Sequence, residues 1–247
     1  MTFNWKKILV VSIDIVIAAY LVLAITAFNK PDTPKKVCTE VKIDIRDDVV
    51  DGFLNTEEIT KILRHNKVYP IGKPMLAIDV RDIEETLRRS PFVDEAECHK
   101  TQDGKVCISL SQRMPIVRVK ADNGEDYYID NHGGVMPNTK YTGDLVIATG
   151  AVTKAYAQKT LTRVGNILVN DRFWHRQIVQ IHVLPDGSLE LVPRVGEHIV
   201  YLGMPTGVEQ KLSRLRKFYK YGLSQAGWNK YAYINIEFDN QIICKKK

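Results

Sequence analysis

The segment SPFVDEAECHKTQDGKVCISLSQRMPIVRV, residues 90–119, contains two runs in which apolar and polar residues alternate, Val93–His99 and Lys105–Ser111. Alternation with a period of two is typical of strands that bury one face. The dipeptide Asp103-Gly104 between the runs favours a tight turn. Pro115 ends ladder pairing because it has no backbone N–H to donate. The segment therefore predicts a β-hairpin whose exit lies at Pro115.

One strand and two helices are predicted before the hairpin. Residues 41–45 alternate between apolar and polar types, which indicates a strand. Asn55 followed by Glu58 is a capping box that starts a helix, and Asp79 is the expected cap of a second helix that stops before Pro91. The apolar faces are Ile59, Ile62 and Leu63 in the first helix and Val80, Ile83 and Leu87 in the second. The predicted order is strand, helix, helix, strand, strand.

Near the N-terminus, the 21 residues ILVVSIDIVIAAYLVLAITAF (8–28) carry a single formal charge, that of Asp14. At ~1.5 Å per residue, a helix of this length spans roughly 31 Å, the thickness of a bilayer's hydrocarbon core. We therefore predict a membrane-spanning helix from Ile8 to Phe28, after a cytoplasmic tail of residues 1–7.

The residues before this run predict its orientation. Trp5, Lys6 and Lys7 precede the run, and no acidic residue does. An excess of positive charge is typical of the cytoplasmic side. We therefore expect a polar linker over residues 29–36 and the rest of the chain outside the cytoplasm. A cleaved signal peptide is the alternative, but its apolar core spans only ~7 to 15 residues. Asp14 is interpreted equally well as contacting a partner helix or as snorkelling to the headgroups.

Composition and cysteine spacing limit the class of protein. Lys and Arg number 35 against 29 Asp and Glu, which gives a net charge of +6 and a pI near 9.0. A mildly basic domain outside the cytoplasm suits anionic lipid, cell-wall polymer or acidic partners, and nothing recommends nucleic acid. The cysteines follow no metal spacing and allow three disulfide pairings; they are Cys38, Cys98, Cys107 and Cys244. Because Cys98 and Cys107 are out of phase across the turn, we expect free, half-buried thiols.

No pattern in the sequence is typical of catalysis. The histidines are scattered, without the HExxH spacing of a metal site. The chain also has no Gly-x-Ser-x-Gly elbow, no Ser-x-x-Lys and no phosphate loop. We therefore predict no catalytic, cofactor-binding or metal-binding residue.

The second half of the chain predicts strands and two helices. Strands are expected over residues 146–149, 177–184, 188–193 and 198–202, with Pro185-Asp186-Gly187 as a turn. One helix is expected over residues 156–170, with the apolar stripe Leu161, Val164 and Leu168.

The longest helix of this half is expected over residues 208–224. Thr206 and Glu209 form its predicted capping box, and its buried face is Leu212, Leu215, Phe218, Tyr219 and Leu223. The other face carries Lys211, Arg214, Arg216, Lys217 and Lys220. We interpret this basic face as a solvated surface, with a site for an acidic partner as the alternative.

The C-terminal residues predict two more strands. Residues 231–238 (YAYINIEF) are rich in aromatic and β-branched types, and a turn at Asp239-Asn240 leads to a very short strand over residues 241–244. We expect a sheet edge that is partly unpaired, which is either blunted against aggregation or completed by another chain. Lys245–Lys247 fit both interpretations, as blunting charges or as steering charges for an acidic partner.

The order of elements and three motifs resemble the FtsQ/DivIB family of bacterial cell-division proteins. The strand-helix-helix-strand-strand unit after an anchor resembles a POTRA domain. QRMPIV at residues 112–117 is similar to the family pattern Glu-Arg-x-Pro-Val-Ala, and YIDNHGGV at residues 128–135 to a hydrophobic pair followed by Asp-x-x-Gly-x-Val. YINIEFD at residues 233–239 resembles the family's terminal strand, Tyr-Val-Asp-Leu-Arg-Tyr-Asp. Gln112 stands where the family favours Glu, and Glu237 where it has Arg.

The residues themselves give these motifs structural roles. Arg113 is expected to join a carboxylate at the strand exit, and residues 130–134 to form a hairpin turn with permissive glycines. The resemblance implies an α+β fold with a transmembrane helix, a POTRA domain over residues 37–115 and a mostly antiparallel β domain with two helices over residues 116–247.

The resemblance also implies a non-catalytic scaffold in the cell inner membrane at the division septum. Its partners would be small coiled-coil proteins of the FtsB and FtsL type and septal wall-synthesis membrane proteins. The residues carried over as partner-binding are Tyr233, Ile234, Asn235, Ile236, Glu237, Phe238, Gln241, Ile242 and Ile243. Two alternatives stay open: a POTRA-bearing protein-transport component and a membrane-anchored cell-wall enzyme.

Overall fold

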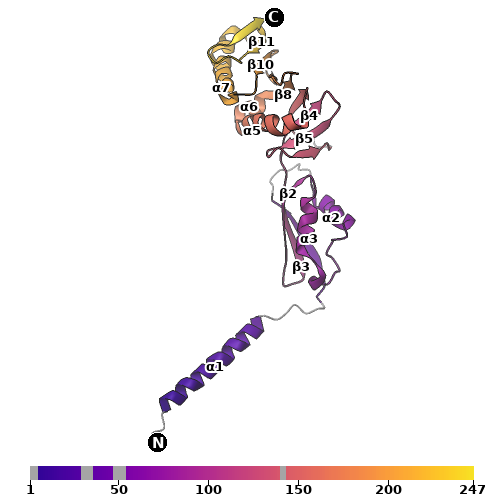
Figure 1. Ribbon diagram of the computed structural model, residues 1–247, viewed down its shortest axis with the longest axis vertical. Helices are drawn as coiled ribbons and strands as arrows, with labels where there is room; N and C mark the ends of the chain where they lie inside the picture. Colours follow the sequence, from indigo (N-terminus) through magenta and orange to yellow (C-terminus); the bar gives the residue numbers. More distant parts are fainter. Residues whose placement is uncertain (1–4, 29–35, 47–53, 140–142) are drawn as a thin grey trace. The chain divides into compact units, whose positions relative to one another are not determined.

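The computed structural model describes residues 5–28, 36–46, 54–139 and 143–247. The chain forms two compact units (Figure 1). The first comprises Met1–Asp44, Ile59–Leu87 and Ala96–Ser109, and the second comprises Ile45–Glu58, Arg88–Glu95 and Leu110–Lys247. The predicted linker lies outside the described residues except for Lys36, as do residues 1–4 of the predicted tail.

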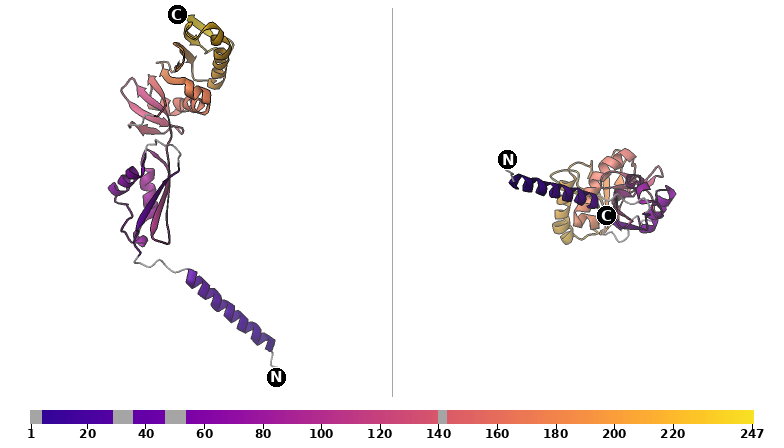
Figure 2. Two further views of the ribbon diagram at one scale, coloured as in Figure 1. Left: turned by 180° about the vertical axis from the view of Figure 1, so that it is seen from behind. Right: turned by 90° about the horizontal axis from the view of Figure 1, so that it is seen from below.

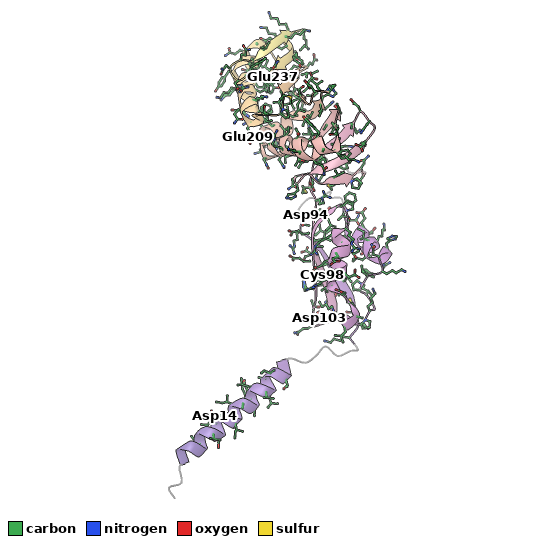
Figure 3. The ribbon with its side chains drawn as sticks, in the orientation of Figure 1. Asp14, Asp94, Cys98, Asp103, Glu209 and Glu237 are labelled. Atoms are coloured by element: carbon green, nitrogen blue, oxygen red, sulfur yellow. The ribbon has the colours of Figure 1, made fainter. Side chains whose placement is uncertain are left out.

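The N-terminal apolar run forms helix α1, Trp5–Phe28. Ile8 and Phe28 lie within it, and Asp14 extends from its middle (Figure 3). The side chains that the structure describes in α1 are those of Leu9 and of residues 11–26, and nearly all are exposed. Within the described part of the chain, no helix combines the length and the apolar character that a membrane crossing needs.

The elements that follow α1 have the predicted order. They are β1 (Glu40–Ile45), α2 (Thr56–His65), the 3-10 turn η1 (Met75–Ala77), α3 (Val80–Arg88), β2 (Val93–Lys100) and β3 (Lys105–Gln112). The strands form a three-stranded sheet in the order β1-β3-β2. In β3, every second residue is buried, as the alternating sequence predicts.

Side-chain caps start both helices where the sequence places them. The Asn55 carboxamide accepts a hydrogen bond from the Glu58 N–H at 2.9 Å, and the Glu58 carboxylate accepts one from the Asn55 N–H at 3.3 Å. The Asp79 carboxylate accepts from the Arg81 N–H at 2.9 Å. These bonds satisfy N–H groups that the first helical turn leaves unpaired. The helices bury Ile59, Leu63, Ile83 and Leu87.

The four cysteines are free thiols that differ in burial. Cys107 and Cys244 are half-buried as expected, whereas Cys38 and Cys98 are fully buried. The expectation of four half-buried thiols is therefore wrong for these two. Cys98, labelled in Figure 3, is buried because it shares the inward parity of Ala96 in β2. Burial, followed by the nearby Glu84, raises the pKa of Cys98 to about 12.

The second unit is built on a nine-stranded sheet with the order β12-β11-β10-β9-β8-β7-β4-β5-β6. Its strands are β4 (Pro115–Ala121), β5 (Asp126–Asp130), β6 (Val135–Pro137), β7 (Val146–Gly150), β8 (Ile178–Val183), β9 (Leu189–Pro193), β10 (Ile199–Gly203), β11 (Tyr231–Asn235) and β12 (Ile243–Lys246). The neighbours β4–β7, β7–β8 and β10–β11 are parallel, and the remaining pairs are antiparallel. The prediction of a mostly antiparallel sheet is confirmed.

Helices α5, α6 and α7 lie on the same side of this sheet in the front and rear views (Figures 1 and 2). The first predicted helix is present as α4 (Lys154–Tyr156), the π-helical segment η2 (Ala157–Leu161) and α5 (Thr162–Asn170). The second is α7 (Val208–Phe218), the π-helical segment η3 (Tyr219–Leu223) and α8 (Ser224–Ala226). An additional helix, α6 (Arg172–Gln177), was not predicted.

The predicted capping box of α7 is wrong. The residue at the N-cap is Gly207, with φ 58 and ψ 34 in the left-handed region, and no side chain caps this helix. Because Gly207 turns the chain directly before Val208, Thr206 lies outside the N-cap position. Glycine adopts this backbone conformation without the strain that a side chain would add.

A buried histidine contacts the helical segment η3. His198 is 3% exposed, and its Nε2 lies 2.8 Å from the Tyr219 hydroxyl. Its Nδ1 is buried without a hydrogen-bond partner among the described residues. Burial lowers the pKa of His198, so folding favours the neutral imidazole. Trp174 and Trp228 pack on Tyr219, with ring centroids 6.0 and 5.1 Å away.

We predict that the free energy of unfolding of the second unit decreases as the pH falls from 6.5 toward about 5. The unfolded His198 takes up a proton near its ordinary pKa of 6.5, whereas the folded residue resists protonation. Stability from this residue is therefore fully present above 6.5 and is lost below it, by at most about 1.4 kcal/mol per pH unit. Urea unfolding followed by tryptophan fluorescence measures this slope. His198→Gln should flatten it, and equal slopes in both proteins would contradict the assignment.

Candidate partner-binding edge of the sheet

Strand β12 is the last strand of the nine-stranded sheet, so its outer side is a sheet edge. It pairs with β11 antiparallel, with Ile243 opposite Asn235 and Lys246 opposite Tyr231. The Lys247 N–H donates to the Lys230 carbonyl on the β11 side at 3.4 Å. Because backbone groups alternate sides along a strand, the N–H groups of Cys244 and Lys246 point away from β11. They are the groups that another strand would use.

Tyr233 is held in the sheet by its side chain. It lies in β11, between β10 and β12, and its hydroxyl donates a hydrogen bond to the Glu190 carboxylate at 3.0 Å. Its ring stacks on Tyr201, with centroids 6.1 Å apart. Burial, followed by the hydrogen bond to Glu190, raises the pKa of Tyr233 and keeps it a donor. Tyr233 thus has a structural role next to the edge.

The other residues predicted to bind a partner divide into core and surface. Ile234 and Ile236 are 0% exposed and belong to the core of the second unit. Phe238 and Ile243 are 44% and 48% exposed. Ile242 is partly buried against the core, Asn235 and Glu237 are half-buried, and Gln241 is exposed. A partner's side chains therefore have access to Phe238, Gln241 and Ile243, and not to the two buried isoleucines.

Two basic residues of α7 hold the backbone beside this edge. The Lys211 ammonium, on a residue 6% exposed, donates to the carbonyls of Leu202 at 3.0 Å and Met204 at 2.8 Å. The Arg214 guanidinium donates to the carbonyls of Ile236 at 3.0 Å and Phe238 at 2.9 Å. Burial lowers the pKa of Lys211. The interpretation of this helix face as solvated is therefore wrong for both residues.

Sequence reasoning did not identify the residues that support this edge. Glu190 and Tyr201 are opposite each other in the β9–β10 ladder, and Tyr233 lies over them from β11. Their one sequence signal is that each stands in a predicted strand. The carbonyls that Lys211 and Arg214 bind belong to the end of β10 and to the residues that follow β10 and β11, which only the tertiary fold places beside α7.

The QRMPIV and YIDNHGGV motifs meet in an ion pair. The Arg113 Nε donates to Asp130 Oδ2 at 2.7 Å, and its Nη2 lies 2.5 Å from the same oxygen. Arg113 also donates to the Pro91 carbonyl at 3.0 Å. The other oxygen of Asp130 accepts from the N–H groups of His132 at 2.9 Å and Gly134 at 2.6 Å. The expected carboxylate partner and hairpin turn are both confirmed.

The glycine at position 134 leaves the space that this arginine occupies. A Cβ on Gly134 would lie 1.8 Å from Arg113 Nη2, and one on Gly133 would lie 2.6 Å from the Gln158 carbonyl oxygen. Gly133 also has φ +85. Both glycines are thus needed for close approach, and the Arg113–Asp130 pair acts as a clamp between the segment that enters β4 and the β5–β6 turn.

The described residues contain no group of three or more His, Cys, Asp or Glu side chains placed to hold a metal ion.

The geometry of the β12 edge supports recognition of another polypeptide through backbone hydrogen bonds and a few exposed apolar side chains.

Comparison with known proteins gives two family matches and a relative. The model described as FtsQ/DivIB, C-terminal related, matches residues 114–245, and a POTRA-like domain model matches residues 36–111. The chain is 26% identical over 188 residues to the cell division protein FtsQ of Geobacter sp. (strain M21). This alignment covers 71% of the chain. The aligned part is 66% of that relative's length.

We predict that Asp130→Asn lowers the free energy of unfolding of the second unit by about 3 kcal/mol, because it leaves the Arg113 charge without its buried partner. The matched control is Asp126→Asn, since Asp126 pairs with Arg118 at 2.8 Å in the same sheet but is 32% exposed. A partly exposed pair contributes at most about 1 kcal/mol. Urea unfolding of the two variants compares them, and equal losses would contradict the role of the clamp.

Proposed function

The chain belongs to the FtsQ/DivIB, C-terminal related family, and we propose that it is a non-catalytic scaffold of the bacterial division machinery. The POTRA-like match and the similarity to a cell division protein support this proposal. The scaffold links septal peptidoglycan-synthesis components through contacts outside the cytoplasm.

We propose that the whole apolar run of residues 8–28, of which the structure describes the side chains of Leu9 and residues 11–26, anchors the chain once in the cell inner membrane, with the N-terminus in the cytoplasm. Its exposed side chains are mostly apolar; those more than half exposed include Leu9, Ile15, Val16, Val22 and Leu23. Apolar side chains in this number are stable in hydrocarbon and unfavourable in water. Lys6 and Lys7 at the start of the helix favour the cytoplasmic side. The proposed location is the division septum.

The observation that carries the scaffold proposal is the sheet edge at β12. A partner segment adds to this edge as a further strand, with main-chain hydrogen bonds giving affinity. Phe238 and Ile243 supply apolar contacts, and Lys245 and Lys246 attract acidic side chains at the rim, whereas Lys247 is paired with Glu197. The proposed partners are coiled-coil division proteins of the FtsB and FtsL type, together with septal wall-synthesis membrane proteins.

We predict that Lys246→Pro weakens capture of the coiled-coil partner about fivefold or more while the chain stays folded. Proline removes an outward N–H that β12 does not use in its own ladder, and one such bond contributes about 1 kcal/mol. Lys246→Ala is the matched control because it removes the same charge and keeps the N–H. Co-purification of the full-length chain with candidate partners measures capture. Equal loss in both variants would show that the charge, and not the strand edge, binds the partner.

Photo-crosslinking in growing cells identifies the partner directly. Probes at Ile243 and Phe238 should capture a small membrane protein with a coiled-coil segment. The control is Lys42, an exposed residue on β1 at the edge of the other sheet. Capture of diverse unfolded chains from Ile243 would instead support a transport component. Equal capture of the same partner from Lys42 would show that binding is not specific to the β12 edge.

A further inference from the structure

The first unit exposes an apolar patch around η1. Val37 is 46% exposed, Ile71 is 45% exposed and Leu76 is 62% exposed. Side chains of this type normally pack inward, and Met75, between the last two, is buried at 4%. Clustered exposed apolar side chains mark interaction surfaces more often than single ones do.

Backbone pairing brings these residues to one end of the unit. Val37 forms an antiparallel bridge with Pro74. The Cys38 N–H donates to the Lys73 carbonyl at 2.9 Å, and the Gly72 N–H donates to the Cys38 carbonyl at 2.9 Å. The segment that enters the unit therefore lies directly beside residues 70–77.

The β2–β3 turn lies at the same end of the unit. The Thr39 N–H donates to the Gly104 carbonyl at 3.0 Å. Asp103, labelled in Figure 3, marks this turn. The apolar patch is thus next to the hairpin tip, and both are next to the point where the chain arrives from α1.

Three lysines belong to the same segments or contact them: Lys36 precedes Val37, Lys73 stands between Ile71 and Leu76, and Lys100 reaches the carbonyl of Met75. The ammonium groups of Lys36, Lys73 and Lys100 each donate to a backbone carbonyl, those of Gln102, Lys67 and Met75, at 2.6 to 2.7 Å. A carbonyl oxygen fixes the position of an ammonium group and does not neutralise its charge.

Carboxylates are also present at this end. Glu40 and Asp103 pair with Lys105 at 2.9 and 3.5 Å, and Asp79 caps α3. Glu40 and Asp103 are therefore partly compensated by Lys105. The three lysines whose bonds go to carbonyls keep their positive charge at this end of the unit.

We propose that this end of the first unit docks on the surface of an anionic phospholipid bilayer, with Val37, Ile71 and Leu76 in the headgroup region. The proposal rests on the proposed anchoring by α1. Residues 29–36 separate Phe28 from Val37, and nine residue steps extend at most about 32 Å. The patch is therefore tethered close to the headgroups. Lysines near an anionic surface and apolar side chains at the interface both favour binding there.

The test uses the full-length chain reconstituted in vesicles that contain phosphatidylcholine brominated in the acyl chains, with or without phosphatidylglycerol. Leu76→Trp places a fluorescent reporter on the patch, in a Trp5→Phe background. We expect bromine to quench this tryptophan several-fold more strongly than Val195→Trp, an exposed position in the second unit. Quenching should require phosphatidylglycerol and weaken at about 0.5 M salt, where charges are screened. Lys36→Gln with Lys73→Gln should reduce it.

Carbonate extraction separates the two ways in which the result can fail. If the chain stays in the vesicles and Leu76→Trp is quenched no more than Val195→Trp, the docking proposal is wrong and the anchor stands. If carbonate releases the chain, the anchor itself is wrong. If quenching does not depend on phosphatidylglycerol or on salt, the assignment to an anionic surface is wrong.

Discussion

An open sheet ends in strands whose outer backbone groups have no partner within the sheet, and this constraint governs the second unit. The nine-stranded sheet ends at β12, whose outward N–H groups belong to Cys244 and Lys246. Such an edge either stays short and charged or receives another strand. Strand β12 is short, with four residues, and it is charged, because Lys245–Lys247 are at its end. It also carries the partly exposed Ile243, which a further strand could contact.

The interactions beside this edge maintain its geometry. Arg214 holds the carbonyls of Ile236 and Phe238, so the segment between β11 and β12 has a defined path. Lys211 does the same at the end of β10. Tyr233 fixes the face of β11 through Glu190 and Tyr201. A template whose backbone is already ordered loses less conformational entropy when a partner pairs with it.

Local signals were sufficient for much of the fold. Asn55, Glu58 and Asp79 act on N–H groups within three residues, so the sequence shows their role directly. The Arg113–Asp130 pair was also predictable in kind, because a buried arginine at a strand exit needs a carboxylate.

Features that depend on tertiary structure were not predictable. Helix α6 has six residues, too few for an apolar period, although its cap Asp171 accepts from the N–H groups of Phe173 and Trp174. The left-handed Gly207 displaced the cap of α7. The parallel pairing of β10 and β11 across α7 made Ile234 and Ile236 core residues, and strand propensity contains no information about neighbours of this kind.

The burial of Cys98 has a chemical consequence. The thiolate is the species that attacks disulfides, and because burial raises the pKa of Cys98 far above its ordinary value, this thiol stays protonated at neutral pH. In an oxidising compartment, the folded chain would therefore exchange disulfides slowly at this sulfur, and native packing would protect it from oxidative scrambling.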